Sequence, residues 1–418
     1  MGMKSSLTDA SGMRRLSYAD PRPALWVVSL LIALAAGVYT GLSAYDTASF
    51  FDSVEPRYVS DEIYYVDTAR RLLQNVFQVD IDYYSYSGKT SEDYYNAEHP
   101  PLGKYIIALS MLLCGDRPLC WRLPSVVEAG LIPVILWAGL ALAYRGVLGP
   151  VAGAAAALAA ASDPVLRVMG SVAMLDIHQA FFTALAIALA ANRRFIPAIS
   201  AAGLAASVKM SGGAIVLATA TVAASWAQGS IWRRLAVFTA GLLIGGSVYI
   251  ALYAPLVLHF GPMWVIEETI NALKWHTTSR PPGPPASSVL GWIINSNPFY
   301  LSLEGRVMAA VTNTVVHATA LGFAAIALLA ELLERRGRPS WPGVAHVYML
   351  FILILYTAVY LAGNRTLYSF YSVQLTPIAA AVIGEATAAM LTWRCRADKH
   401  APSPSTEGYA PEASPKGE

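Results

Sequence analysis

The chain has 418 residues, of which 56% are hydrophobic and only 13% are charged, and its mean hydropathy is +0.47. A water-soluble protein of this length could not bury so much apolar surface, so the composition excludes a soluble globular protein and indicates a polytopic membrane protein. The net charge of +2 does not indicate a charged partner. Three cysteines do not indicate a disulfide framework. Cys114 and Cys120 lie close enough to form a bridge outside the membrane, but we expect two free thiols.

Apolar runs separated by polar turns predict an all-α protein. After an N-terminal tail at 1–23, ten helices are expected to cross the membrane within a domain at 24–392. Each run is about 15 to 25 residues long, which is near the length that crosses ~30 Å of hydrocarbon. The expected spans lie near 24–44, 121–143, 150–168, 174–191, 195–210, 213–228, 235–258, 307–331, 344–362 and 370–391.

Arginines fall in every second connection between these spans. From a cytoplasmic N-terminus, the inward turns hold Arg145, Arg193–Arg194, Arg233–Arg234 and the arginines of 335–338. This alternation follows the positive-inside rule, so we expect both termini in the cytoplasm, including a disordered tail at 393–418. The large loops at 45–120 and 259–306 then lie outside the cell.

The first outer loop carries two adjacent acids at an expected helix start. Ser60 is a good N-cap for a helix that ends near Phe77 and lies in the membrane interface, with its charged face, including Asp67, Arg70 and Arg71, turned away from the apolar one. Asp61 and Glu62 occupy its first turn, where the helix dipole favours ionised carboxylates, so we expect a low pKa for Asp61. Ordinary helix-start acids are the alternative interpretation.

Two further segments place polar residues at the outer surface. In E-H-P-P-L-G-K, residues 98–104, two prolines fix the backbone and hold His99 and Lys104 near the membrane. A short apolar helix, too short to span, follows at 105–113. In A-M-L-D-I-H, residues 173–178, Asp176 falls at the outer end of a helix. An acid there is costly enough to indicate a function, although helix capping would also explain it.

These segments resemble the protein O-mannosyltransferase family. S-D-E-I-Y-Y, E-H-P-P-L-G-K, W-R-L-P-S, A-M-L-D-I-H and G-L-A-A-S-V-K-M-S-G occur in the same order and spacing in that family, and weaker similarity extends to segments at 274–282, 292–300 and 368–377. Its members are membrane glycosyltransferases of the GT-C fold that use a polyprenyl-phosphate sugar. Two departures are Val172, where relatives commonly have an arginine (Arg167 is the nearest here), and the lack of a large soluble insertion in 259–306.

The resemblance implies an inverting transfer of a hexose, with mannose expected, from a polyprenyl or dolichyl phosphate to a Ser/Thr hydroxyl of a protein on the outer face. It points to Asp61 as the general base, which contributes on the order of 10²–10⁴ in rate, and to Glu62 for holding sugar or acceptor. Lys209 is the first candidate for the leaving phosphate, because catalysis usually depends most on stabilising the charge that develops in the reaction; a snorkelling lysine is the alternative. Further phosphate candidates are Arg122 and Arg365, and substrate-binding candidates are His99, Lys104, Asp176, Trp275 and His276.

Other functions and ligands fit the sequence less well. Asp80-Ile81-Asp82 has the form of a metal motif but lacks a nucleotide site beside it, so no metal or cofactor is expected, and a divalent ion on the acidic pair has no further support. Expected partners are the sugar-lipid donor, an acceptor protein or glycan and membrane lipid, with a dimer left open and no nucleic acid. The same fold with a lipid or lipid-linked glycan acceptor is the main alternative. A transporter is expected to contain internal repeats, and this sequence shows none. Retention of Asp61 argues against a non-catalytic partner subunit.

Overall fold

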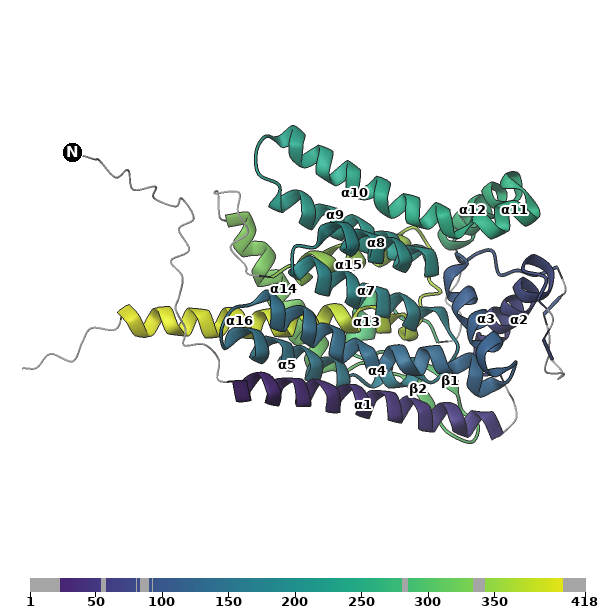
Figure 1. Cartoon of the computed structure of the whole chain (residues 1–418), viewed down its shortest axis with the longest axis horizontal. Helices are drawn as coiled ribbons and strands as arrows, with labels where there is room; N and C mark the ends of the chain where they lie inside the picture. Colours follow the sequence, from purple (N-terminus) through teal and green to yellow (C-terminus); the bar gives the residue numbers. More distant parts are fainter. Residues whose placement is uncertain are drawn as a thin grey trace, which may run out of the picture.

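The computed structural model describes residues 23–53, 58–79, 81–82, 90–91, 93–279, 285–333 and 343–400, without the side chains of 393–400. Most of both predicted tails, Asp80 and the arginines of 335–338 lie outside the described residues. Long apolar helices run side by side and form the body of the molecule (Figure 1). They are α1 (Pro23–Ser53), α4 (Pro118–Ala143), α5 (Leu148–Ala161) with α6 (Pro164–Gly170), α7 (Leu175–Ala191), α8 (Phe195–Val208), α9 (Gly213–Trp226), α10 (Ile231–Leu252), α14 (Thr314–Leu333), α15 (Ala345–Leu361) and α16 (Thr376–His400).

These helices confirm the predicted polytopic all-α fold. Within the described ranges, five helical segments are long and apolar enough to cross a membrane: α1, α4, α10, α14 and the segment Ser369–Thr392. The bent pair α5 and α6 makes a sixth, and the shorter apolar helices α7, α8, α9 and α15 fill the remaining predicted positions. The protein is therefore an integral membrane protein with about ten transmembrane helices.

The predicted span at 150–168 is a broken helix. Its two parts meet at an angle of 65°, and Asp163 between them has an extended backbone. Pro164 explains the break, because proline disfavours a helical conformation in the residue before it. The Asp163 carboxylate accepts hydrogen bonds from Asn313 N at 2.9 Å and Thr376 Oγ1 at 2.7 Å, so the break is fixed to the starts of α14 and α16.

Glycines allow α1 and α4 to pack closely. A Cβ added at Gly37 would lie 2.5 Å from Gly130 O, and one added at Gly41 would lie 3.6 Å from Gly130 Cα. Small residues of this kind let helix backbones approach each other in a membrane, where dispersion contacts replace the hydrophobic effect as the source of association. A larger side chain at Gly37 would separate α1 from the bundle.

Short elements gather beyond one end of the bundle (Figure 1). They are α2 (Glu62–Arg71) with the π-helical turn η1 (Leu72–Val76), α3 (Leu102–Cys114), α11 (Ala254–Phe260) and α12 (Pro262–Thr277), whereas α13 (Val289–Ile293) lies among the long helices in this view. An antiparallel pair, β1 (Phe299–Ser302) in the second large loop and β2 (Met308–Ala310) at the start of the span expected near 307–331, was not predicted, and the helix of that span begins only at Thr314. The single turns η2 (Met210–Gly212) and η3 (Ser369–Gln374) precede α9 and α16.

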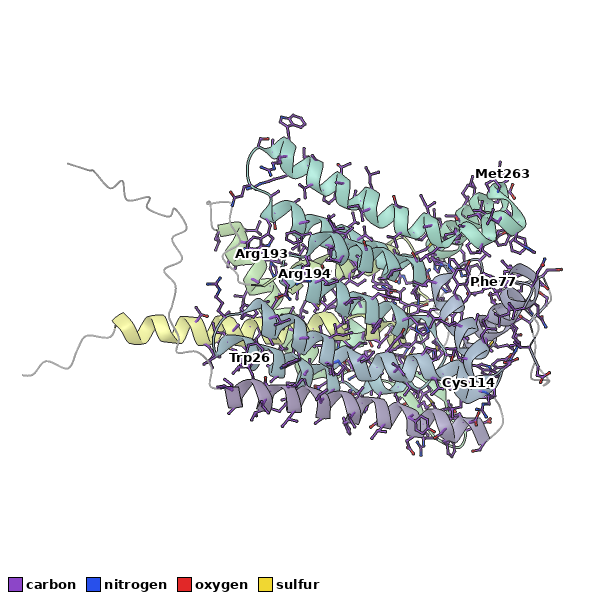
Figure 2. All side chains as sticks on the ribbon, in the orientation of Figure 1. Trp26, Phe77, Cys114, Arg193, Arg194 and Met263 are labelled. Atoms are coloured by element: carbon purple, nitrogen blue, oxygen red, sulfur yellow. A yellow bond between two sulfur atoms is a disulfide. The ribbon has the colours of Figure 1, made fainter. Side chains whose placement is uncertain are left out.

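The two ends of the bundle differ in their side chains. Arg193 and Arg194 lie at the end where α1 begins, near Trp26, whereas Phe77 and Met263 lie at the opposite end (Figure 2). The basic turn between α7 and α8 is thus at the end away from the first large loop, which is the arrangement that the positive-inside rule requires of a cytoplasmic end.

The first loop corrects the expected start of its helix and the expected exposure of the charged face. Ser60 adopts a left-handed backbone with φ of 55° and does not cap the helix; Asp61 is the N-cap residue and Glu62 the first helical one. The charged face of α2 is buried rather than exposed, with Asp67, Arg70 and Arg71 at 3%, 6% and 8% exposure. These residues form ion pairs and hydrogen bonds with other segments, which offset the cost of burying them.

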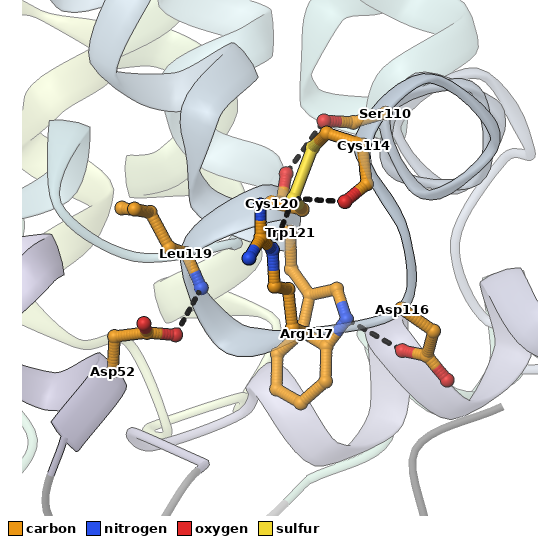
Figure 3. Close-up of a disulfide and its surroundings, with 8 residues drawn as sticks. All are labelled: Asp52, Ser110, Cys114, Asp116, Arg117, Leu119, Cys120 and Trp121. Atoms are coloured by element: carbon orange, nitrogen blue, oxygen red, sulfur yellow. Dashed lines mark hydrogen bonds between the residues drawn. A yellow bond between two sulfur atoms is a disulfide. The ribbon is translucent and has the colours of Figure 1, made fainter. Parts of the chain in front are cut away.

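The expectation of two free thiols is wrong. Cys114 and Cys120 form a disulfide with a Cα–Cα distance of 5.9 Å between the end of α3 and the start of α4 (Figure 3). Gly115 after α3 has a positive φ of 92°, a conformation that glycine adopts without strain, and this turns the chain back so that the two cysteines meet.

Candidate active site

A cavity of about 970 Å³ lies at the end of the bundle that carries the first outer loop. Four groups of residues line it: the start of α2, the segment 90–99, the C-terminal half of α12 and the membrane helix ends around 209–211 and 355–371. The lining is rich in aromatic rings with a few charged groups among them, which is typical of a site that binds an organic ligand.

Asp61 lies in this lining at the N-terminus of α2. Burial raises the pKa of its carboxyl group to about 6, Lys209 acts in the opposite direction, and Asp176 raises the pKa further. The expectation of a low pKa is therefore wrong, because the cost of removing the carboxylate from water exceeds the favourable effect of the nearby positive charge. A carboxylate with a pKa close to the working pH is well suited to accept a proton.

Lys209 lies where α8 ends and the chain becomes extended. Its ammonium Nζ is 2.8 Å from Asp176 Oδ1 and 3.7 Å from the centre of the Tyr371 ring. Gln374 Nε2 donates a second hydrogen bond of 2.6 Å to the same Asp176 oxygen. The Lys209 side chain is 7% exposed and lines the cavity, so it does not extend along the surface toward solvent.

Asp176 is buried behind Lys209. It is fully buried, and its Oδ2 has no hydrogen-bond partner among the described residues. Oδ1 binds the lysine and the glutamine, and Asp176 does not itself line the cavity. The predicted cation and the predicted acid thus form one unit at the cavity wall, with the positive charge facing the cavity.

The structure pairs two predicted ligand-binding residues with each other. Glu62 and Arg122 have fully buried side chains and form a two-point ion pair, with distances of 2.8 Å from Arg122 Nε and 2.7 Å from Nη2. Glu62 also accepts hydrogen bonds from Val59 N and Ala173 N. Neither side chain lines the cavity. The position of Glu62 therefore argues against a sugar-holding role and that of Arg122 against a phosphate-binding role.

The two histidines predicted to bind substrate lie together in the lining. The ring centres of His99 and His276 are 5.2 Å apart, and His276 Nε2 lies 2.9 Å from Glu98 O. Burial, together with nearby positive charges, holds the pKa of His99 well below its usual value, so this imidazole is neutral at physiological pH. Trp275 also lines the cavity and is 54% exposed.

Lys104 and Arg365 lie outside the cavity lining. The Lys104 ammonium donates hydrogen bonds to Asn96 O at 2.7 Å and His99 O at 2.6 Å, so it supports the wall from behind. Burial lowers its pKa to about 7. The exposed Arg365 guanidinium packs on the Tyr360 ring at 4.8 Å. These positions argue against direct ligand binding by either residue.

Several lining residues were not among the predicted site residues. Tyr371, which contacts Lys209, lies in the segment 368–377, whose weak family resemblance assigns a role to none of its residues. Tyr64, Tyr65 and Tyr94 belong to the tyrosine-rich loop, where many tyrosines are present and the sequence cannot say which face the cavity. Among the described residues, no three His, Cys, Asp or Glu side chains converge as metal ligands.

Residues 98–259 match the model of the family described as dolichyl-phosphate-mannose-protein mannosyltransferase. A comparison with curated protein sequences finds no match. The structure is similar to that of ArnT from Cupriavidus metallidurans bound to undecaprenyl phosphate, with 18% identity and a TM-score of 0.53, over 86% of this chain and 59% of that chain. The apo state of ArnT gives 17% identity and a TM-score of 0.52, over 90% and 62% of the two chains.

A further similar structure is the oligosaccharyltransferase AglB from Archaeoglobus fulgidus, with 14% identity and a TM-score of 0.48, over 92% of this chain and 53% of that chain. The present chain thus spans less than two thirds of the length of ArnT. The predicted resemblance is confirmed: the chain is similar over residues 98–259 to the dolichyl-phosphate-mannose-protein mannosyltransferase family, and it has the GT-C fold.

Proposed function

We propose that the protein is an inverting membrane glycosyltransferase that moves a hexose, first of all mannose, from a polyprenyl or dolichyl phosphate to a Ser/Thr hydroxyl of a protein. The observation that carries the proposal is the presence of Asp61 and Lys209 in the lining of one cavity, close enough for each charge to influence the other. One group can accept a proton and the other can stabilise a phosphate, and both are needed for this reaction.

The proposed step forms one bond and breaks one. The acceptor oxygen attacks the anomeric carbon as the bond from that carbon to the phosphate oxygen breaks, and attack from the opposite face inverts the anomeric centre. The acceptor proton passes to the Asp61 carboxylate, which becomes neutral. The bonding electrons leave with the lipid phosphate, whose increasing negative charge is stabilised by the Lys209 ammonium.

Asp176, Gln374 and Tyr371 would prepare Lys209 for this role. The carboxylate favours the charged form of the buried ammonium, and the ring and the amide fix its position. A charge that is already fixed before the reaction does not have to reorganise as the phosphate leaves, and this makes it more effective than a mobile one. The family match and the undecaprenyl phosphate bound to ArnT, a protein of the same fold, support a lipid-phosphate donor.

We place the cavity at the outer face of the membrane and both termini in the cytoplasm. The basic turn at Arg193–Arg194, at the end of the bundle away from the cavity, supports this orientation. A donor lipid would keep its chain in the bilayer and present its phosphate at the ends of the membrane helices, where Lys209 lies. An acceptor would approach from the aqueous side.

The test is transfer by the purified protein in detergent. Dolichyl-phosphate mannose and glucose, each radiolabelled, would be incubated with the protein and either a Ser/Thr-rich peptide or a membrane lipid extract. Label in the peptide that alkaline β-elimination releases would support protein O-glycosylation, and label only in the lipid fraction would assign a lipid or lipid-linked acceptor. The absence of transfer from both donors to either acceptor, with Asp61→Asn as the blank, would overturn the proposal.

A further inference from the structure

The segment at 90–98, which we call the wall, lines the cavity without regular secondary structure. Residues 90–98 include five lining residues, Thr90, Ser91, Tyr94, Asn96 and Glu98, and the described part forms turns but no helix or strand. A segment without regular secondary structure must have its backbone groups bound by other elements if it is to present a fixed surface. In this protein two charged side chains of α2 bind the first half of the wall, while Lys104 and His276 contact Asn96 O and Glu98 O in its second half.

Asp67 and Arg71 hold the first half of this wall, from Thr90 to Tyr94. Asp67 Oδ2 accepts hydrogen bonds from Thr90 N at 2.7 Å and Thr90 Oγ1 at 3.2 Å. Arg71 donates to Thr90 O at 2.9 Å and to Tyr94 O at 2.7 Å. Both side chains are buried, so these are charge-assisted bonds in a region with little water, where such bonds are strong.

Asp67 is in turn fixed by Arg70. The distance from Arg70 Nη1 to Asp67 Oδ1 is 2.6 Å, and the Tyr58 hydroxyl donates to the same carboxylate oxygen. The remaining nitrogens of the guanidinium bind Asp116, with Nε at 2.5 Å from Oδ2 and Nη2 at 2.9 Å from Oδ1. Arg70 thus joins two carboxylates that are far apart in the sequence.

Asp116 is itself held on two sides. Trp121 Nε1 donates a hydrogen bond of 2.6 Å to Asp116 Oδ1, and the same indole ring lies 4.9 Å from the Arg70 guanidinium. Asp116 also lies inside the short loop that the disulfide between Cys114 and Cys120 closes (Figure 3). The chain of contacts therefore runs from a covalently closed loop, through Arg70 and Asp67, to the backbone of the cavity wall.

This arrangement is more than is needed to keep α2 folded. Burying charges is expensive, and a packed apolar cluster of similar volume would stabilise a fold equally well or better. A bidentate guanidinium–carboxylate pair does supply fixed geometry. Moreover, the other end of the same helix carries Asp61, so the wall and the proposed base are held by one rigid element.

We propose that Asp67, Arg70 and Asp116 are positioning residues that hold the wall at 90–98 as the acceptor-binding surface of the site. The inference rests on the proposed glycosyl transfer. It assigns the wall to the acceptor because the wall belongs to the loop beyond the ends of the membrane helices, where a water-soluble acceptor would arrive (Figure 1). The phosphate site at Lys209 belongs to other elements and depends on none of these contacts.

The test compares acceptor and donor kinetics in Asp116→Asn and Arg70→Lys. Each substitution preserves side-chain size or charge but removes the two-point ion pair, since lysine cannot form the planar fork. With dolichyl-phosphate mannose and a Ser/Thr-rich peptide, we expect the peptide KM to rise about tenfold or more, because small displacements of positioning groups are costly. The donor KM should stay within about twofold of wild type. The double variant should be little worse than either single one, because both break the same pair.

Arg117→Gln is the matched control: Arg117 is exposed and donates to Cys120 Sγ at 3.3 Å in the same loop, so this variant changes the loop without removing the Arg70–Asp116 ion pair. Equal changes in donor and peptide KM, or an unchanged peptide KM, would overturn the inference. Proteolysis of the wall requires no glycosyl transfer, so it tests the contacts of the wall independently of the proposed function. In both variants, chymotrypsin should cleave after Tyr94 or Tyr95 faster than in wild type, because the wall opens locally. An unchanged rate of cleavage would show that Arg70 and Asp116 do not hold the wall, whether or not the wild-type protein transfers sugar. A lack of transfer by the wild-type protein would refute the proposed function alone.

Discussion

The raised pKa of Asp61 leads to the most specific prediction. If the Asp61 carboxylate accepts the acceptor's proton, only its ionised form is active, so kcat/KM should rise with pH through about 6 and level off above 7. Asp61→Asn keeps the size of the side chain but cannot accept the proton. We expect it to lose about 10²-fold or more in turnover at neutral pH while it still binds the donor lipid.

The same pKa predicts an effect on stability that is independent of activity. The difference between the ordinary value of 3.8 and about 6 corresponds to about 3 kcal/mol in favour of the neutral carboxyl group in the folded state. Because the folded protein binds this proton more tightly than the unfolded chain, stability should fall as pH rises from about 4 to about 6. Asp61→Asn removes this effect, so its melting temperature relative to wild type should increase over the same interval and then remain constant.

Both effects can be measured on one detergent preparation. Initial rates and melting temperatures would be recorded between pH 4.5 and 8 for wild type, Asp61→Asn and the control Asp46→Asn. Asp46 is suitable because its side chain is 70% exposed and lies in α1, away from the cavity. If Asp61→Asn turns over at nearly the wild-type rate, Asp61 is a helix cap and not the base. A kcat/KM that stays constant down to pH 4.5 would show that burial does not control the pKa of this group.

Three further predictions test other parts of the site. Lys209→Ala should raise the donor KM at least tenfold with a smaller change in peptide KM, since it removes the charge proposed to face the phosphate; equal donor KM in variant and wild type would move that role to another residue. Glu62→Ala and Arg122→Ala should each destabilise the protein by about 3–5 kcal/mol, because each leaves a buried charge without its partner, and a melting temperature near that of wild type would contradict this. With the third cysteine replaced by serine, a cysteine at Glu304 should react with an impermeant thiol reagent in intact cells and one at Gln228 should not; the reverse pattern would invert the topology.

The sequence predicts the membrane helices well because their signal is local. Each span is a continuous apolar run, and each basic turn lies directly between two runs, so neither prediction requires knowledge of which helices are neighbours. The break at Asp163 shows the limit of this reasoning. Pro164 is visible in the sequence, but the partners of the aspartate come from the starts of α14 and α16, far along the chain.

The candidate site is less predictable because its chemistry depends on long-range pairing. Nothing in the sequence says that Arg122 binds Glu62 rather than a phosphate, or that Arg70 binds Asp116 across the first outer loop. The pKa of Asp61 is a similar case. A helix N-terminus favours the ionised form, and this is visible in the sequence, whereas the larger opposing effect of burial exists only after the cavity has formed.

The adjacent acids Asp61 and Glu62 illustrate how one helix start can serve two purposes. Successive residues in a helix point about 100° apart, so two neighbours at a helix start face different surroundings. Asp61 faces the cavity, whereas Glu62 faces the protein interior and binds Arg122 of α4 and the backbone of Ala173. Ala173 lies three residues before Asp176, which holds Lys209. Glu62 therefore fixes the element that carries the proposed base to the element that positions the proposed phosphate ligand. Glu62, which does not face the cavity, thus sets the distance between the proposed base Asp61 and the proposed phosphate ligand Lys209.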